Sequence, residues 1–168
     1  MEYVGYVSNE GKIFQCIDGS EASMKAADYA IMTAKRNDAQ LTVLHVLYSQ
    51  TGYAYSSGTF GGLVTPSSIR AIYESAKQEA QQWFDKVKVK INEQEKEEQK
   101  EKNQIQLKTE LVVTATSVAA AIVGYSEQHD IDLIVIGTRG RSGFRKLLLG
   151  SVAFGVATCA HCPVMVVK

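Results

Sequence analysis

Short apolar runs with strand character alternate with helical patterns along most of this 168-residue chain. The strand-like runs cover residues 13–17, 41–47, 105–113, 132–136 and 163–167. The helical patterns between them cover residues 22–34, 69–91, 118–129 and 149–160. The run at 132–136 is typical of a fully buried strand, and the small alanines repeated along 22–34 predict a helix that packs close to the sheet. Because strands separated by helices pair in parallel and need cover on both faces, this order predicts a three-layer α/β/α fold around a five-stranded parallel sheet.

Length and charge favour one ordinary globular domain over residues 1–168. Apolar residues make up 45% of the chain and charged residues 21%, as in typical soluble proteins. The 18 basic and 18 acidic side chains cancel, so no overall field favours nucleic acid or an anionic membrane as a partner. No secretion signal opens the chain, and no apolar run approaches the roughly 20 residues of a membrane helix. We therefore expect a cytoplasmic protein.

Two stretches depart from the regular alternation. Residues 48–66 are rich in Gly, Ser, Tyr and Thr and are long for a connection inside a compact domain, which predicts a loop insertion. Residues 92–103 are mostly Glu, Lys and Gln, and they continue a helix whose apolar stripe runs from Ile69 to Ile91. We expect this charged end to overhang or fray, because a helix over residues 68–101 would be about 50 Å long.

The segment from Gly137 to Ser151 reads GTRGRSGFRKLLLGS and contains no acid. Its glycines would permit sharp turns and close approach of a ligand, and a helix that begins at Gly150-Ser151 would offer unpaired N–H groups to an anion. The segment matches neither GxxxxGK[ST] nor GxGxxG. Composition alone leaves two alternatives, a phosphate-binding loop and a basic surface turn. We expect Arg141, Arg145 and Lys146 to be solvated loop charges rather than individual ligands.

Three stretches follow or end predicted strands: Asp18-Gly19-Ser20, Val46-Leu47 and the segment from Gly137 onward. Ligands of open α/β sheets bind beyond the carboxyl ends of the strands, where the strand order reverses. These three stretches could therefore surround one ligand. The alternative is that Asp18 with Ser20, and likewise Ser151, only cap the helices that follow them.

Cysteine and histidine residues give no metal or catalytic signal. Cys159-Ala160-His161-Cys162 has no second pair of ligands for tetrahedral zinc. It also falls at the end of a predicted helix, whereas a redox-active thiolate is stabilised at a helix start. Neither His45 nor His129 has a partner for nucleophilic catalysis that the sequence reveals. We therefore assign no catalytic residue.

The spacing Gly137-x-x-Gly140, nine residues, then Gly150-Ser151 resembles the G-2x-G-9x-G-(S/T) motif of the ATP-binding branch of the universal stress protein family. Further stretches are similar to that family in the same order, over essentially the whole chain: IDGSEAS, LHV, DLIVIGTRGRSG, LLLGSVAFGVA and CPVMVVK. The resemblance implies a Rossmann-like fold of the adenine nucleotide alpha hydrolase type, with strand order 3-2-1-4-5. It also implies a homodimer, which we place at the final strand, Val164–Val167, as an edge open to pairing.

The resemblance also assigns residues to a nucleotide site. Asp18 matches the aspartate on the ribose side, and Val46 matches the residue whose backbone reads the adenine edge. The remaining matches are to phosphate-binding positions, namely Gly137, Arg139, Gly140, Gly150, Ser151 and Val152. Three features depart from the family pattern: Cys16 where alanine or proline is common, Thr116 where glycine is common, and the insertion at 48–66.

The resemblance implies a protein that binds ATP, and also AMP or ADP, together with magnesium or manganese. We expect it to act as a nucleotide-dependent sensor or regulator of a stress response. One alternative is a slow ATPase or nucleotide hydrolase on the same fold. Another is a dimeric interaction protein that binds no nucleotide, which the intact glycine spacing disfavours.

Overall fold

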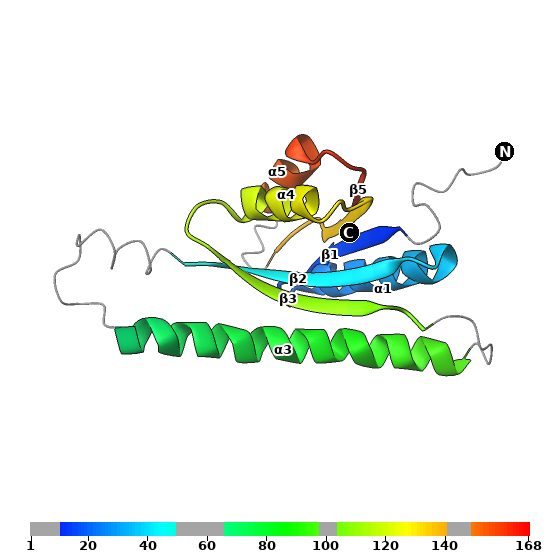
Figure 1. Cartoon of the computed structure of the whole chain (residues 1–168), viewed down its shortest axis with the longest axis horizontal. Coiled ribbons are helices and arrows are strands. Elements are labelled where there is room, and N and C mark those ends of the chain that lie inside the picture. The colour runs from blue at the N-terminus through cyan, green and yellow to red at the C-terminus, as the bar shows by residue number, and fades with distance from the viewer. Residues whose placement is uncertain (1–10, 50–65, 98–103, 141–148) are drawn as a thin grey trace.

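The structure, a computed structural model, describes residues 11–49, 66–97, 104–140 and 149–168. These residues form three layers, with a sheet between α4 and α5 on one side and α1 and α3 on the other (Figure 1). The strands are β1 (Lys12–Cys16), β2 (Gln40–Tyr48), β3 (Leu107–Thr114), β4 (Leu133–Gly137) and β5 (Val164–Val167). The helices are α1 (Glu21–Asn37), α3 (Pro66–Glu97), α4 (Val118–Gln128) and α5 (Ser151–Cys159).

The sheet has five strands in the order β3-β2-β1-β4-β5, and all its pairs are parallel. This confirms the predicted fold class and strand order. In the central register, Ile13 of β1 lies between Leu41 of β2 and Leu133 of β4. The chain moves outward from β1 to β3 on one side and from β4 to β5 on the other, so the strand order reverses between β1 and β4. Parallel sheets of this kind carry their ligands at that reversal.

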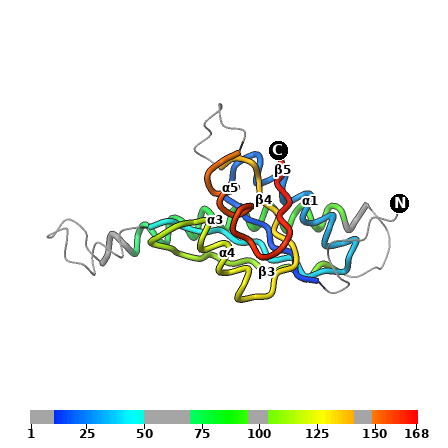
Figure 2. Tube along the Cα trace, turned by 90° about the horizontal axis from the view of Figure 1, so that it is seen from above, coloured from blue at the N-terminus to red at the C-terminus, as the bar shows by residue number. Residues whose placement is uncertain are grey.

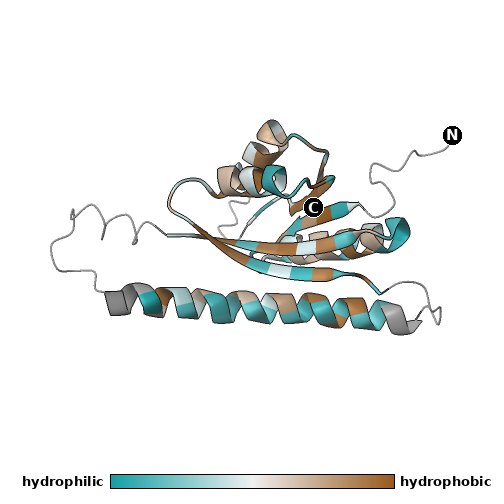
Figure 3. Ribbon diagram, in the orientation of Figure 1, coloured by the Kyte–Doolittle hydropathy of each residue, from teal (hydrophilic) through white to brown (hydrophobic). Residues whose placement is uncertain are grey.

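Apolar side chains of β1 and of the residue after it alternate between two hydrophobic clusters, one on each face of the sheet. Ile13 and Ile17 pack with α1 and α3, whereas Phe14 and Cys16 pack with α4 and α5. All five residues of β4 are buried, because both faces of this strand are covered. Figure 3 shows hydrophobic residues repeated along the strands between the helical layers. In the views of Figures 1 and 2, α4 and α5 lie next to each other on their face.

Helix α1 lies close to the sheet because the residues that face the strands are small. Ala26, Ala30 and Ala34 are almost completely buried, which confirms the predicted small-residue stripe. The first turn of α1 approaches the end of β4 closely, since a Cβ atom at Gly137 would lie 2.7 Å from the carbonyl carbon of Ala22. Glycine is therefore required there for the contact between β4 and α1, independently of any ligand.

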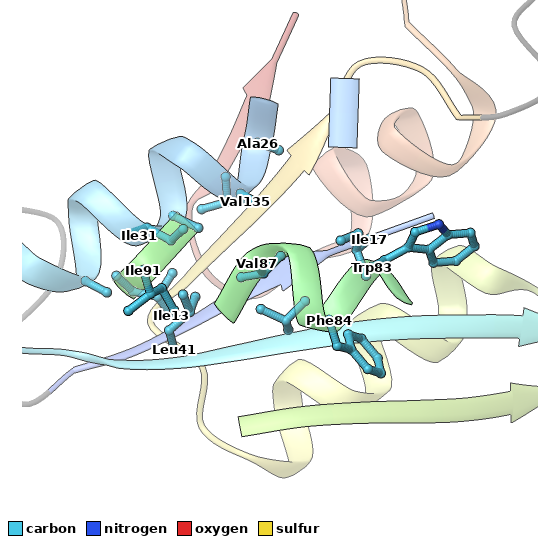
Figure 4. Close-up of a cluster of buried hydrophobic side chains, with 14 of the residues drawn as sticks. Ile13, Ile17, Ala26, Ile31, Leu41, Trp83, Phe84, Val87, Ile91 and Val135 are labelled. Carbon is cyan, nitrogen blue, oxygen red and sulfur yellow. The ribbon is translucent and has the colours of Figure 1, made fainter. Parts of the chain in front are cut away.

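Helix α3 is longer than the sheet that it covers, and only its second half is buried. The predicted stripe is buried at Ala80 and, as Figure 4 shows, at Trp83, Phe84, Val87 and Ile91. Earlier in the same stripe, Ile72 and Tyr73 are 48% and 38% exposed, so the predicted apolar stripe extends beyond the part of the helix that the core buries. The reason is length, since 32 residues of helix span about 48 Å at 1.5 Å per residue.

Several expectations fall outside the residues that the structure describes. These are most of the loop insertion (50–65), the last part of the charged helix end (98–103) and the basic residues Arg141, Arg145 and Lys146. Within the described ranges, none of the helices combines the length and hydropathy that crossing a membrane requires.

Candidate functional site

A cavity lies at the carboxyl ends of β1, β2 and β4 and at the start of α5. Including its open mouth, it holds about 660 Å³ not occupied by protein atoms. The structure brings together every residue that the family resemblance assigns to the nucleotide. The residues that line the cavity include Asp18, Val46, Gly137, Arg139, Gly140, Gly150, Ser151 and Val152.

The turn after β1 is held together by hydrogen bonds between Asp18 and Ser20. Ser20 donates its backbone N–H to Asp18 Oδ1 at 3.0 Å and its hydroxyl to the same oxygen at 2.6 Å. The Ser20 hydroxyl also accepts the N–H of Ser23 at 3.2 Å, which makes Ser20 the N-cap of α1. The cap predicted for Asp18 with Ser20 is therefore present, with Ser20 as the N-cap residue and Asp18 as its hydrogen-bond partner. The Asp18 carboxylate thus accepts hydrogen bonds from the N-cap residue and also borders the cavity.

Ser20 also lies beside the loop after β4. Its hydroxyl lies 3.2 Å from the backbone oxygen of Arg139 and 2.6 Å from Asp18 Oδ1. A hydroxyl has one proton to donate, so these two acceptors compete for it, and the shorter bond favours Asp18. Sequence reasoning did not include Ser20 among the site residues. The Asp-Gly-Ser signal predicts a helix cap but does not reveal a neighbour 119 residues away.

The two glycine segments of the motif are adjacent in space. Gly150 donates its N–H to the carbonyl of Thr138 at 2.7 Å, and a Cβ atom at Gly150 would lie 3.2 Å from that same oxygen. Thr138 in turn donates its N–H to Val167 at 2.7 Å, which ties the loop to the end of β5. The spacing of the motif thus brings both segments to the same wall of the cavity.

Helix α5 begins at this wall without a side-chain cap. Gly150 is its N-cap residue and Ser151 its first helical residue, so the alternative in which Ser151 is the N-cap is wrong. The amides of a helix's first turn have no partner within the helix. Ser151 and Val152 line the cavity, where such amides together with the Ser151 hydroxyl suit an anion.

The rest of the cavity wall is apolar. Cys16, Ile136 and Ile122 line it and belong to the cluster between the sheet and α4 and α5. Burial, and to a smaller extent the nearby Asp18 carboxylate, raises the pKa of the Cys16 thiol far above its usual range. Cys16 is therefore a neutral, apolar part of this wall and not a nucleophile. An apolar wall opposite polar donors suits a ligand with a flat ring at one end and a charged group at the other.

Two further residues could offer chemistry. His45 lies along the cavity, and its Nδ1 is 2.8 Å from the carbonyl oxygen of Ile17. Because a carbonyl only accepts, this nitrogen carries the proton in that bond. Cys159 is the last residue of α5, as predicted for the Cys-Ala-His-Cys segment. In the described part of the chain no three His, Cys, Asp or Glu residues are grouped to hold a metal ion.

Comparison with known proteins gives matches along almost the whole chain. The family model described as the universal stress protein family matches residues 11–168. Universal stress protein MJ0531 of Methanocaldococcus jannaschii is 36% identical over 157 residues, which cover 94% of this chain and 81% of the relative. Universal stress protein YxiE of Bacillus subtilis is 32% identical over 157 residues, covering 94% of this chain and 98% of the relative.

Solved structures share the same fold. The universal stress protein UspA from Lactobacillus plantarum has a TM-score of 0.71 and 25% identity, covering 96% of this chain and 99% of that one. Two more distant neighbours contain nucleotides. A universal stress protein from Archaeoglobus fulgidus, in complex with dAMP, has a TM-score of 0.60 at 19% identity and covers 94% of this chain and 97% of that one. A family member from Arabidopsis thaliana, with AMP bound, has a TM-score of 0.59 at 16% identity and covers 94% of this chain and 91% of that one.

Proposed function

Because this chain belongs to the universal stress protein family, we propose that it binds ATP, and also AMP or ADP, as a non-enzymatic sensor or regulator of a stress response. The observation that carries this proposal is the meeting of three distant segments around one cavity. The turn after β1, the end of β2 and the start of α5 all line it, at the reversal of strand order. The nucleotides in the two neighbouring structures support the same class of ligand.

In the proposed complex the adenine ring lies against the apolar wall, where backbone groups of Val46 recognise its edge. Asp18 accepts a hydrogen bond from the ribose, since its carboxylate borders the cavity. The phosphates lie at the start of α5, where the amides of Ser151 and Val152 and the Ser151 hydroxyl are available. Gly137, Gly140 and Gly150 line this space, and Arg139 adds positive charge. Most of the binding energy then comes from backbone donors and helix geometry.

A divalent cation fits this arrangement only as a companion of the phosphates. Among the lining residues that the structure describes, Asp18 is the single carboxylate, and one carboxylate is too few for an all-protein cation site. Magnesium usually retains several waters and binds through phosphate oxygens with one or two carboxylates. Magnesium or manganese would therefore arrive with ATP, and Asp18 would contact its hydration shell.

Replacing Asp18 tests the ribose contact. A hydrogen bond to a charged group contributes about 1.5–3 kcal/mol, so Asp18→Ala is expected to weaken ATP binding about tenfold to hundredfold. Titration calorimetry with ATP and magnesium measures this change. Asp18 also accepts the hydrogen bonds of the capping residue Ser20, so Asp18→Ala changes the turn as well as the ribose contact. Asp18→Asn separates these two effects better, because it keeps an oxygen acceptor for Ser20. Asp85→Ala, at a side chain that is 58% exposed on α3, is the control and should bind ATP normally.

The same proteins discriminate between binding and hydrolysis. We expect wild-type protein incubated with ATP to release no phosphate beyond a trace. Sustained phosphate release that Asp18→Ala abolishes would show that the protein is an ATPase. A flat calorimetric titration of the wild type with ATP, ADP and AMP would instead favour an interaction protein without nucleotide.

We also propose a homodimer through β5, the edge strand beside β4. Ile134 donates its N–H to Pro163 at 3.0 Å, and Thr138 donates to Val167 at 2.7 Å. Backbone groups of successive strand residues point to opposite sides. The N–H and C=O groups of Val164 and Val166 therefore face away from β4, where a second copy of β5 can pair with them.

A proline in β5 tests this pairing. Val166→Pro removes an outward N–H without removing a hydrogen bond to β4, and proline is tolerated in edge strands. The variant is expected to sediment as a monomer at concentrations where wild type sediments as a dimer. Val166→Ala keeps the N–H and should remain dimeric. If Val166→Pro dimerises as tightly as wild type, the subunits do not meet through this edge.

A further inference from the structure

Gly19, in the turn between β1 and α1, is required for two separate reasons. Its φ of +79° lies in the left-handed region, which residues other than glycine rarely adopt. In addition, a Cβ atom there would lie 2.5 Å from Nε1 and 2.6 Å from Cζ2 of the Trp83 indole. The backbone of the turn thus rests directly on an aromatic ring from α3, 64 residues later in the chain.

Trp83 also contacts the residue that fixes the start of this turn. Its ring meets the His45 imidazole edge to face, with centroids 4.9 Å apart at 83°. His45 in turn donates from Nδ1 to the carbonyl of Ile17. Figure 4 shows the Trp83 indole beside Ile17, at the end of the buried cluster. One ring therefore supports Ile17 through His45 and supports Gly19 directly, and Asp18 is the residue between these two supports.

We propose that Trp83 is a positioning residue of the nucleotide site, which holds the Asp18-Gly19-Ser20 turn in the geometry that binds the ribose. This inference rests on the proposed nucleotide function. Trp83 belongs to the core cluster of α1 and α3 and is absent from the cavity lining formed by the described residues. It acts on the ligand only through the turn. The Ser20 hydroxyl also lies 3.2 Å from the backbone oxygen of Arg139, so this turn borders the loop at the phosphates.

The physical effect is preorganisation. A turn that contains glycine loses more conformational freedom on ordering than other turns, and packing against a rigid ring removes that freedom before the ligand arrives. Without the ring, part of the ordering cost is transferred to the binding step. Trp83→Leu is therefore expected to weaken AMP binding about tenfold, within the usual range of coupling between sites.

The experiment compares matched aromatic substitutions on one helix. Trp83 and Phe84 are adjacent and are 7% and 5% exposed, but in Figure 4 they point in different directions, and only Trp83 reaches the turn. Trp83→Leu, Trp83→Phe and Phe84→Leu are each titrated with AMP by calorimetry, and urea unfolding measures their stability. We expect both leucine variants to lose stability, but only Trp83→Leu to lose affinity. Trp83→Phe should recover most of the affinity because it restores an aromatic ring below Gly19.

A double-mutant cycle with Asp18→Ala identifies the route of the effect. If Trp83 acts through the turn, Trp83→Leu should weaken AMP binding less than about twofold once Asp18 is already alanine. The positioning role is wrong if Trp83→Leu lowers AMP affinity equally in the wild-type and Asp18→Ala proteins. It is also wrong if Trp83→Leu and Phe84→Leu bind AMP with equal affinity. In both cases AMP binding by the wild type is unaffected. If the titration of wild-type protein with AMP is flat, the proposed nucleotide function is wrong, and the positioning role of Trp83 is wrong with it.

Discussion

Gly19→Ala is expected to be strongly destabilising for a change that adds a single methyl group. The left-handed φ of +79° penalises alanine by about 1–2 kcal/mol. The new Cβ would also overlap the Trp83 indole, at 2.5 Å from its Nε1, and overpacking of a core typically costs about 1–3 kcal/mol. Together these effects predict a loss of at least about 2 kcal/mol, out of the 5–15 kcal/mol typical of a folded domain.

Chemical unfolding in urea measures this loss, and Gly124→Ala is its matched control. Gly124 lies within α4, and a Cβ atom there would meet nothing within 4 Å. Alanine should stabilise that helix by about 0.5–1 kcal/mol relative to glycine. The two substitutions therefore add the same methyl group and should move the unfolding midpoint in opposite directions. A Gly19→Ala protein as stable as wild type would mean that the turn and the indole do not pack as the structure shows.

Gly140→Glu is expected to abolish nucleotide binding and leave the fold intact. A Cβ atom at Gly140 would lie 2.7 Å from Asp18 Oδ2, a side-chain atom that can move aside. Of the glycines in the described ranges, only Gly19 has a positive φ, so the backbone at Gly140 accepts a side chain. The glutamate would then place a second carboxylate beside Asp18 and next to the proposed phosphates. Like charges in such contact cost several kcal/mol, which predicts at least about a hundredfold loss of affinity.

Calorimetry with ATP measures this affinity, and the far-UV circular dichroism and unfolding midpoint check the fold. Gly124→Glu adds the same charge on α4, outside the cavity lining, and should bind ATP as wild type does. Gly140→Ala should fall between wild type and Gly140→Glu, because it displaces Asp18 without adding charge. If Gly140→Glu binds ATP as tightly as wild type, the phosphates do not lie next to this loop.

The contrast between Gly137 and Gly140 shows why the motif needs the structure for its interpretation. Spacing alone treats the two glycines alike. In the fold, a Cβ atom at Gly137 would meet backbone atoms of α1, whereas one at Gly140 would meet the end of a side chain. Gly137 is thus required for packing between a strand and a helix, and Gly140 is the better test of ligand binding.

The sequence by itself determined the layer architecture. The apolar run of β4 predicted a strand buried on both faces, and the alanines of α1 predicted a helix close to the sheet, because burial imposes a period on the chain that can be read locally. Strand order and the eight site positions came from the family resemblance. That these positions line one cavity then follows from parallel strands, whose carboxyl ends share an edge.

Tertiary structure alone decided which distant side chains support the site. No local pattern relates Ser20 to Arg139 or Gly19 to Trp83, because each pair joins elements far apart in sequence. The sequence also could not predict that Ile72 is exposed. An apolar stripe indicates which face of a helix can be buried, but not how far the sheet extends beneath that helix. Periodicity reports the burial of one element at a time, and contacts between elements depend on how those elements pack together.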